Sequence, residues 1–179
     1  VTPEEMTKAI KTFPRGSSGG PSGLRPQHLK DALTPGWADE VARQIAEVAN
    51  LMAKGKTPIK AREYIMGASL TALPKPDSRL RPVAAGEVLR RVVAKALWAG
   101  IKDDIKERLE PLQVGVGTSM GADSIVHSVR EWLKRNADDE GKVLGMLDLT
   151  NAFNEIERSA FRKAVREMMP SLAPWVDSC

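Results

Sequence analysis

The stretch Val143-Leu-Gly-Met-Leu-Asp-Leu-Thr-Asn-Ala-Phe-Asn154 places a single carboxylate, that of Asp148, in an otherwise apolar run. The run predicts a strand, and the turn residues at 150–151 end it. An ionised carboxylate in apolar surroundings needs a cation or several hydrogen-bond donors to offset its desolvation. Phe153 follows the acid closely, beside the small Ala152. We therefore interpret this stretch as a place that holds a metal ion next to a flat, bulky ligand.

Asp148 has a second interpretation, in which its side chain caps the helix that follows, because Asx turns are common at strand ends. The helical pattern begins several residues later, however, and Asn154 or Glu155 could cap it. Magnesium is often held by one or two carboxylates, with water and substrate phosphates as the other ligands. A strand-end aspartate fits that role, and a lone aspartate leaves both interpretations open.

The chain of 179 residues is 42% hydrophobic and 28% charged, which is typical of a folded globular protein and excludes a disordered or fibrous one. Its charge is uneven. Residues 60–102 include nine basic and three acidic side chains, a larger excess than the net charge of +4 for the whole chain. Such a stretch favours a polyanionic partner, such as nucleic acid or a triphosphate. A solvated surface with scattered lysines is the alternative.

The single cysteine, Cys179, excludes an internal disulfide and fits a reducing, intracellular compartment, either nuclear or cytoplasmic. The longest apolar runs are far shorter than the ~20 residues that cross a bilayer, so no membrane association is expected. The chain begins at Val1 and stops after Cys179, which indicates a piece of a longer protein. No pattern indicates an oligomeric state.

Helical patterns cover most of the chain. Thr2 has the position of an N-cap, with Pro3 and Glu5 in the first helical turn. The glycines and prolines of 13–26 predict a segment without regular structure, which we interpret as a flexible linker. Further helices are predicted over residues 27–33, 34–54, 86–109, from Gly121 to about 135, and 157–168.

Four of these helices have an apolar stripe that is expected to be buried. In the 86–109 helix the stripe is Leu89, Val92, Val93, Ala96 and Leu97. In the 34–54 helix the stripe is Val41, Ile45, Val48 and Met52. In the helix after Gly121 it is Ile125, Val129 and Leu133. In the last helix it is Phe161, Ala164, Val165 and Met168.

Two β-like runs, 64–73 and 83–85, flank a basic turn and predict a hairpin with a cationic tip. Lys75 and Arg81 lie on either side of that turn. Lysine binds phosphate as a point charge, whereas arginine can form two parallel hydrogen bonds with phosphate oxygens. The tip would suit a nucleotide triphosphate, and a solvated basic turn is equally compatible with these residues.

The loop Gln113–Gly121 contains three glycines before a helix N-terminus, so its amides could meet a phosphate. It is not a Walker loop, because no Gly-Lys-Ser/Thr follows. His28 and His127 have no cysteine or histidine partner at metal spacing and are interpreted as ordinary residues. Helices, a hairpin, more helices and a strand without a neighbouring partner together predict an α+β fold with an incomplete sheet.

Five segments, in this order, resemble motifs in the N-terminal half of the reverse transcriptase domain of non-LTR retrotransposons and related retroelements. They are Gly19-Gly-Pro-Ser-Gly-Leu-Arg-Pro-Gln-His-Leu29, Leu73-Pro-Lys-Pro76 with Leu80-Arg-Pro82, Gly86–Ala96, Gln113–Gly117, and Asp148-Leu-Thr-Asn-Ala-Phe153. Five matches in order are far more specific than any one of them. The resemblance implies helix-rich fingers with a hairpin over residues 1–142, followed over 143–179 by the first strand and helix of a polymerase palm.

The resemblance implies an RNA-directed DNA polymerase that adds deoxynucleotides to a DNA primer along an RNA template, using two Mg²⁺ ions. Asp148 would be the catalytic metal ligand, and Lys75 and Arg81 would contact the triphosphate of the incoming dNTP. Gln113 and Gly115 would face the template.

The same resemblance places three further residues at the nucleotide. Leu149 would help to complete the metal and nucleotide site with its backbone, and Ala152 would line it. Phe153 would stack under the sugar and exclude a ribose 2′-hydroxyl, so that the enzyme selects deoxynucleotides.

The chain departs from the family pattern at Ser22, where an aspartate is usual, and at Val116, where an aromatic is usual. The family's second metal-binding motif, an aromatic followed by any residue and two aspartates, is expected downstream of Asp148 and is absent. The pairs 103–104 and 138–139 lie upstream and are interpreted as solvated aspartates. These 179 residues alone are therefore predicted not to polymerise. A noncatalytic, polymerase-derived nucleic-acid-binding module and an RNA-directed RNA polymerase are the alternatives.

Overall fold

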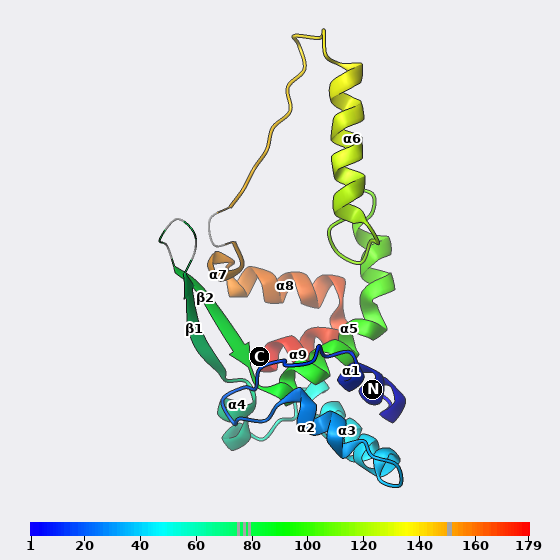
Figure 1. Cartoon of the computed structure of the whole chain (residues 1–179), viewed down its shortest axis with the longest axis vertical. Coiled ribbons are helices and arrows are strands. Elements are labelled where there is room, and N and C mark those ends of the chain that lie inside the picture. Colours follow the sequence, from blue (N-terminus) through cyan, green and yellow to red (C-terminus); the bar gives the residue numbers. More distant parts are fainter. Residues whose placement is uncertain (75, 77, 79, 150–151) are drawn as a thin grey trace. The chain divides into compact units, whose positions relative to one another are not determined.

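The computed structural model describes residues 1–74, 76, 78, 80–149 and 152–179, apart from the side chain of Phe153. Over these residues the fold is α+β, as predicted, with many helices and one two-stranded antiparallel sheet (Figure 1). The chain divides into two compact units, residues 1–99 with 158–179, and residues 100–157. The boundary between fingers and palm at 142/143 concerns function, and it stays a prediction.

The first unit contains most of the elements. They are α1 (Pro3–Lys11), α2 (Pro26–Ala32), α3 (Ala38–Ala53), α4 (Ile59–Ile65), β1 (Ala68–Pro74), β2 (Leu80–Gly86), the first half of α5 (Val88–Leu109), α8 (Arg158–Met168), a 3₁₀ turn at Pro170–Leu172, and α9 (Ala173–Ser178). The second unit contains the rest of α5, then α6 (Gly121–Arg135) and α7 (Ala152–Glu155). No helix in the described part of the chain is long and apolar enough to cross a membrane.

The N-terminus of α1 has the predicted cap. Thr2 Oγ1 accepts a hydrogen bond from the Glu5 N–H at 3.2 Å, and the Glu5 carboxylate accepts one from the Thr2 N–H at 2.8 Å. Asn50 of α3 fixes this end of α1, because its side chain accepts from the Val1 ammonium and donates to the Val1 carbonyl. The cap thus stabilises the start of α1, and the asparagine docks it against α3.

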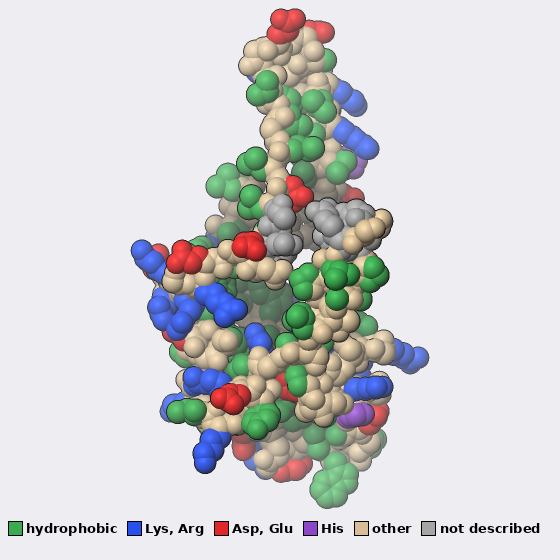
Figure 2. Space-filling model, turned by 90° about the vertical axis from the view of Figure 1, so that its left-hand side faces the viewer, with side chains coloured by type: hydrophobic (Ala, Val, Ile, Leu, Met, Phe, Trp, Pro, Cys, Tyr) green, Lys and Arg blue, Asp and Glu red, His purple; other side chains and the backbone are tan. Residues whose placement is uncertain are grey.

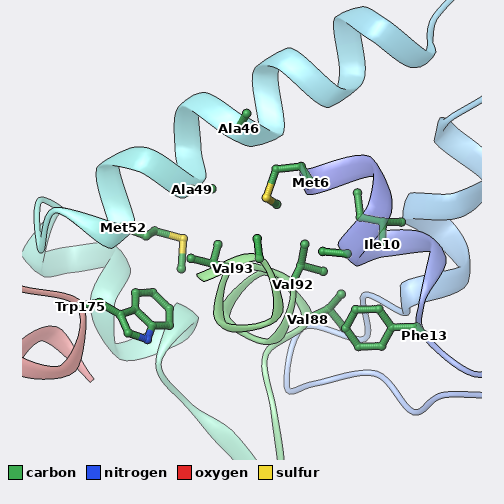
Figure 3. Close-up of a cluster of buried hydrophobic side chains, with 12 residues drawn as sticks. Met6, Ile10, Phe13, Ala46, Ala49, Met52, Val88, Val92, Val93 and Trp175 are labelled. Carbon is green, nitrogen blue, oxygen red and sulfur yellow. The ribbon is translucent and has the colours of Figure 1, made fainter. Parts of the chain in front are cut away.

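The core of the first unit lies between α1, α3 and the first turns of α5 (Figure 3). Its buried side chains include Met6 and Ile10 of α1, Met52 of α3, Val88, Val92 and Val93 of α5, and Phe13 and Trp175. On α3 the inward stripe consists mainly of alanines at 42, 46 and 49, none more than 3% exposed. Of the predicted stripe, Met52 is buried and Ile45 packs against the core, whereas Val48 is 41% exposed, so the prediction was right at two positions and wrong at Val48. Small side chains let two helices approach closely, and a search for large apolar residues overlooks them.

Several element boundaries differ from the predictions. The predicted start of α3 at Thr34 is wrong, because the Thr34 carbonyl accepts from the N–H groups of Trp37 and Ala38 in a turn, and the helix begins at Ala38. The strand predicted from residue 64 begins at Ala68, because α4 continues to Ile65. Gly86 ends β2 rather than opening α5.

The predicted hairpin is present, and its strands pair from Ala68 opposite Gly86 to Pro74 opposite Leu80. Every residue of β1 is exposed, and so are the first five residues of β2. Figure 2 shows hydrophobic side chains gathered over this ribbon. An isolated two-stranded ribbon is at best marginally stable in water. The position of the ribbon therefore depends on how its base is held.

The second unit corrects two predictions. Residues 143–149 are extended but form no strand, and the side chains of Met146 and Leu147 are 89% and 98% exposed. A strand needs a partner for its ladder, and the described strands pair only with each other. The stripe predicted on α6 is not covered, since Ile125 and Leu133 are about half exposed. The predicted turn at 150–151 lies outside the described residues.

The last predicted helix is observed as α8, which begins at Arg158. Of its predicted stripe, Val165 is buried, whereas Phe161 and Met168 are 45% and 42% exposed. The guanidinium groups of Arg162 and Arg166 bind the Asp177 carboxylate of α9 at 2.8 and 2.9 Å. Two arginines therefore join α8 to the C-terminal helix.

Candidate nucleic-acid interface

Arg81 is exposed near the tip of the hairpin. It lies opposite Leu73 in the ladder, one pair from the last one, Pro74 with Leu80. Lys75, its predicted partner in triphosphate binding, lies outside the described residues. Directly opposite residues of an antiparallel pair have their side chains on the same face of the ribbon. The guanidinium of Arg81 is thus available to an anionic ligand at this end of the ribbon.

The base of the hairpin is held by the first turn of α5. The Glu87 N–H donates to the Gly67 carbonyl at 3.2 Å, which continues the pairing one step below the last ladder pair. Nη1 of Arg90 donates to the Met66 carbonyl at 2.9 Å. Both bonds reach the main chain just before β1, so the start of α5 fixes where the ribbon leaves the helical body.

The carboxylate of Glu87 is buried, with 5% of the residue exposed, and has three donors. Ser22 donates its N–H at 3.0 Å and its hydroxyl at 2.8 Å, and Val88 donates its N–H at 2.9 Å. Burial raises the pKa of Glu87, but these hydrogen bonds outweigh it and leave the pKa below its ordinary value. The carboxylate therefore stays ionised and binds the segment that contains Ser22.

Gly20 shows how closely that segment approaches α5. A Cβ at this position would lie 2.6 Å from the Glu87 Cα and 3.0 Å from its carboxylate oxygen. Real Cβ atoms do not come so near to backbone, so only glycine fits here. Residues 18–24, here called the glycine-rich segment, are irregular as predicted, but their interpretation as a free linker is wrong.

Cations of α5 also hold the chain just before Ser22. Arg91 donates to the Ser18 carbonyl at 2.7 Å, and Lys95 donates to Thr12 Oγ1 at 3.1 Å. Both charges lie over the ring of Phe13, 5.2 and 4.4 Å from its centroid. Part of the basic stretch at 60–102 therefore stabilises the fold rather than facing a polyanion, whereas Arg81 remains exposed.

The loop before α6 is organised by the side chain of Gln113. Its Oε1 accepts hydrogen bonds from the N–H groups of Gly115 and of Val116, the latter at 3.0 Å. Gly121 is required where the loop meets the helix, because a Cβ there would lie 1.8 Å from the Val114 carbonyl oxygen. The structure thus brings Gln113 and Gly115 together. Their contact with a template stays a prediction.

Asp148 is exposed, so the expectation of a desolvated carboxylate is wrong for this chain. Leu149 and Ala152 are exposed too, and the side chain of Phe153 lies outside the described residues. Within the described residues, no three His, Cys, Asp or Glu side chains are grouped as metal ligands would be. The carboxylate of Asp148 is of the kind that Mg²⁺ prefers, and its role as a metal ligand stays a prediction.

The other polar residues behave as ordinary surface groups. The aspartates at 103–104 and 138–139 are exposed, as predicted. Asp139 caps a turn through the Gly141 N–H at 3.0 Å and pairs with Lys142 at 3.2 Å. His28 accepts a long hydrogen bond of 3.4 Å from the Arg25 N–H within its own helical turn.

Sequence reasoning missed Glu87 and Gly20. The available signal was a glutamate between a strand and an apolar helix, one position before the first helical residue, where a carboxylate can accept from the helix N-terminus. Its main partner, Ser22, is 65 residues earlier in the chain, so local pattern could not identify the pair.

No family model matches the chain. The chain is similar to the "Retrotransposable element SLACS 132 kDa protein" of Trypanosoma brucei gambiense, with 25% identity over 167 residues that cover 92% of this chain. Those residues are 13% of that protein, so the chain spans a small part of its relative's length. The likeness is distant, and it connects the chain with a retroelement protein.

Proposed function

We propose that this chain is the N-terminal part of an RNA-directed DNA polymerase domain of the non-LTR retroelement type. In this proposal the chain supplies the fingers and the beginning of the palm, and its substrates are an RNA template, a DNA primer and dNTPs. The reaction joins the primer 3′-oxygen to the α-phosphorus of the dNTP and breaks the bond to the leaving pyrophosphate.

The observation that carries the proposal is the order of the five motifs, within a chain that is similar along 92% of its length to a retrotransposable element protein. Two structural features support it. Arg81 is exposed near the hairpin tip, where a triphosphate could reach it. Asp148 is exposed, so a metal ion or a nucleotide could reach its carboxylate.

The residues that the motifs single out have distinct roles in the proposed reaction. Arg81, with Lys75, binds the triphosphate and offsets its charge. Asp148 offers a carboxylate oxygen as a metal ligand, with the backbone at Leu149 and the small Ala152 beside it. Phe153 would stack under the sugar. A magnesium ion held there would supply Lewis-acid stabilisation for the primer hydroxyl and for the leaving pyrophosphate.

Primer extension by the complete parent protein tests the proposal. With an RNA template, a DNA primer, dNTPs and Mg²⁺, we expect extended product that is lost in Asp148→Asn. The matched control is Asp138→Asn, which changes an exposed aspartate in a polar turn and should leave extension unchanged. Equal extension by wild type and Asp148→Asn would refute the role of Asp148.

The same experiment separates the alternative functions. A parent protein that retains template–primer but extends it with no nucleotide is a noncatalytic binding module. One that extends an RNA primer with rNTPs in preference to dNTPs is an RNA-directed RNA polymerase. Either result would replace the proposal.

A further inference from the structure

The first turn of α5 contacts two segments that are far apart in the sequence. Through the Glu87 N–H and the Arg90 guanidinium it holds the base of the hairpin. Through the Glu87 carboxylate and the Arg91 guanidinium it holds the glycine-rich segment at Ser22 and Ser18. Glu87 takes part in both connections, with its main chain toward the hairpin and its side chain toward the segment.

The glycine-rich segment has little freedom to move relative to Glu87. Glu87 is buried and charged, so it requires its donors, and Ser22 supplies two of the three described. Gly20 lies against the Glu87 main chain so closely that the segment cannot move toward α5. A displacement of the segment therefore has to shift the carboxylate, or leave it with the Val88 N–H as its one remaining described donor.

The connection on the hairpin side decides where the ribbon lies. All of β1 and most of β2 are exposed, so packing along the described ribbon contributes little to its position. Its fixed points are at the base, where Met66 and Gly67 accept from Arg90 and Glu87. A small rotation at the base would move Arg81, near the far end of the ribbon, by more than it moves the base.

We propose that Glu87 is a positioning residue that couples the glycine-rich segment to the nucleotide-binding hairpin through the first turn of α5. The proposal rests on the proposed function for its consequence, namely that the state of residues 18–24 sets the affinity of the hairpin for the dNTP triphosphate. The coupling itself is a property of the fold and can be measured without catalysis.

Hydrogen–deuterium exchange on the 179-residue chain tests the coupling. Ser22→Ala removes one donor from Glu87 and also the acceptor of the Leu24 N–H at 3.1 Å, so the exchange of the hairpin, not that of Leu24, decides the test. We expect faster exchange in residues 18–24 and also in 68–74 and 80–86, with the amides of α1 and α3 unchanged. Glu87→Gln should give the same pattern with a larger change, because it replaces the charged acceptor.

Ser18→Ala is the matched control, since Ser18 contributes its main-chain carbonyl to the Arg91 bond and the substitution keeps that carbonyl. It should leave the exchange of the hairpin unchanged. Faster exchange in the glycine-rich segment with an unaltered hairpin in Ser22→Ala would overturn the coupling. If Glu87→Gln also loosens α1 and α3, the Ser22→Ala result alone decides.

Steady-state kinetics of the complete parent protein test the consequence. Ser22→Ala should raise KM for dNTP by about tenfold, the size expected for one hydrogen bond to a charged acceptor, with kcat nearly unchanged. A purely structural role would lower the active fraction, and hence kcat, at constant KM. If the wild-type parent shows no polymerase activity, the proposed function fails, and the exchange experiment still decides the coupling.

Discussion

Glu87 is both buried and ionised, and among the described residues that are buried it is the charged one. Removing a carboxylate from water is costly unless donors replace its hydration. Here the donors come from two directions, the helix N-terminus at Val88 and the distant Ser22. The ionised state of Glu87 therefore depends on the contact between α5 and the glycine-rich segment.

Glu87 gives a pH dependence of known sign. Burial raises its pKa, but the hydrogen bonds from Ser22 and Val88 leave it below the ordinary value of 4.5. Because the folded pKa is lower than the unfolded one, its contribution to stability is complete above pH 4.5 and is lost as the pH falls through the folded pKa. Urea unfolding between pH 6 and pH 3, chosen as roughly one to two units on either side of that value, should show a shallower acid loss for Glu87→Gln than for wild type. Parallel curves for the two proteins would contradict this.

Phe153 carries the proposed selection of deoxynucleotides. In the complete parent enzyme we expect Phe153→Val to admit ribonucleotides, because a smaller side chain leaves room for the 2′-hydroxyl. The measurement is the ratio of kcat/KM for dNTP and rNTP, with Phe161→Val on α8 as a control that should keep the wild-type ratio. An unchanged ratio in Phe153→Val would refute the assignment of this residue.

Single-residue predictions from the sequence succeeded where the interaction is local. The Thr2 cap was predicted because its partner, Glu5, lies within the same turn. The tasks of Arg91 and Lys95 were not, because a cation that binds Ser18 or the Phe13 ring has the same sequence pattern as a solvated one. The roles of Asp148, Arg81 and Gln113 remain predictions that depend on the resemblance.

Helix α3 packs with an unusually small inward face. Its buried positions at 42, 46 and 49 are alanines, whereas the larger Val48 and Leu51 are exposed. Asn50, which binds both polar groups of Val1, reinforces the same contact with the N-terminal end of the chain. The spacing between α1 and α3 thus depends on these small side chains as well as on the larger Met52.

A larger residue in this stripe should force the helices apart. Ala49 is fully buried, so we expect Ala49→Leu to lower the free energy of unfolding by about 1–3 kcal/mol, the usual cost of overpacking a core. Val48→Leu is the matched control on the same helix, and because Val48 is 41% exposed its effect should be within roughly 0.5 kcal/mol. Chemical denaturation measures both. Equal losses of stability in Ala49→Leu and Val48→Leu would contradict the assignment of the alanine face to the core.

Secondary-structure elements could be predicted where their hydrogen-bond partners lie nearby in the sequence. They could not be predicted where the partner is a distant segment. The hairpin was predicted because its two strands pair with each other across a short turn. The strand at 143–149 was not observed, because its ladder partner is not among the described strands. The stripe of α6 failed for the same reason, since an amphipathic pattern indicates that a helix has an apolar face but not what covers it.

The molecule as a whole has one well-packed unit, residues 1–99 with 158–179, and a second unit, 100–157, in which few side chains are buried. The core and the glycine-rich segment belong to the first. Asp148 and the Gln113 loop belong to the second. The residues proposed for nucleotide, metal and template are therefore divided between two units of the chain.

Asp148 is the one carboxylate proposed as a metal ligand, and on that ground we predict that the 179-residue chain does not polymerise. One carboxylate cannot hold two metal ions in line with a primer hydroxyl, and the described residues offer no group of three metal-ligating side chains. A primer-extension assay with the chain, an RNA template and Mg²⁺ should give no product. Product that disappears in Asp148→Asn would contradict the prediction.

The exposed run Val143–Leu149 also affects the solubility of the protein. It combines β-prone apolar side chains, no proline and a single charge, the features of segments that assemble into intermolecular sheets. Asp148 is that single charge, so it opposes self-association whatever its role in chemistry. The Asp148→Asn protein should therefore precipitate at lower concentration than wild type, and light scattering must accompany any activity measurement made with it.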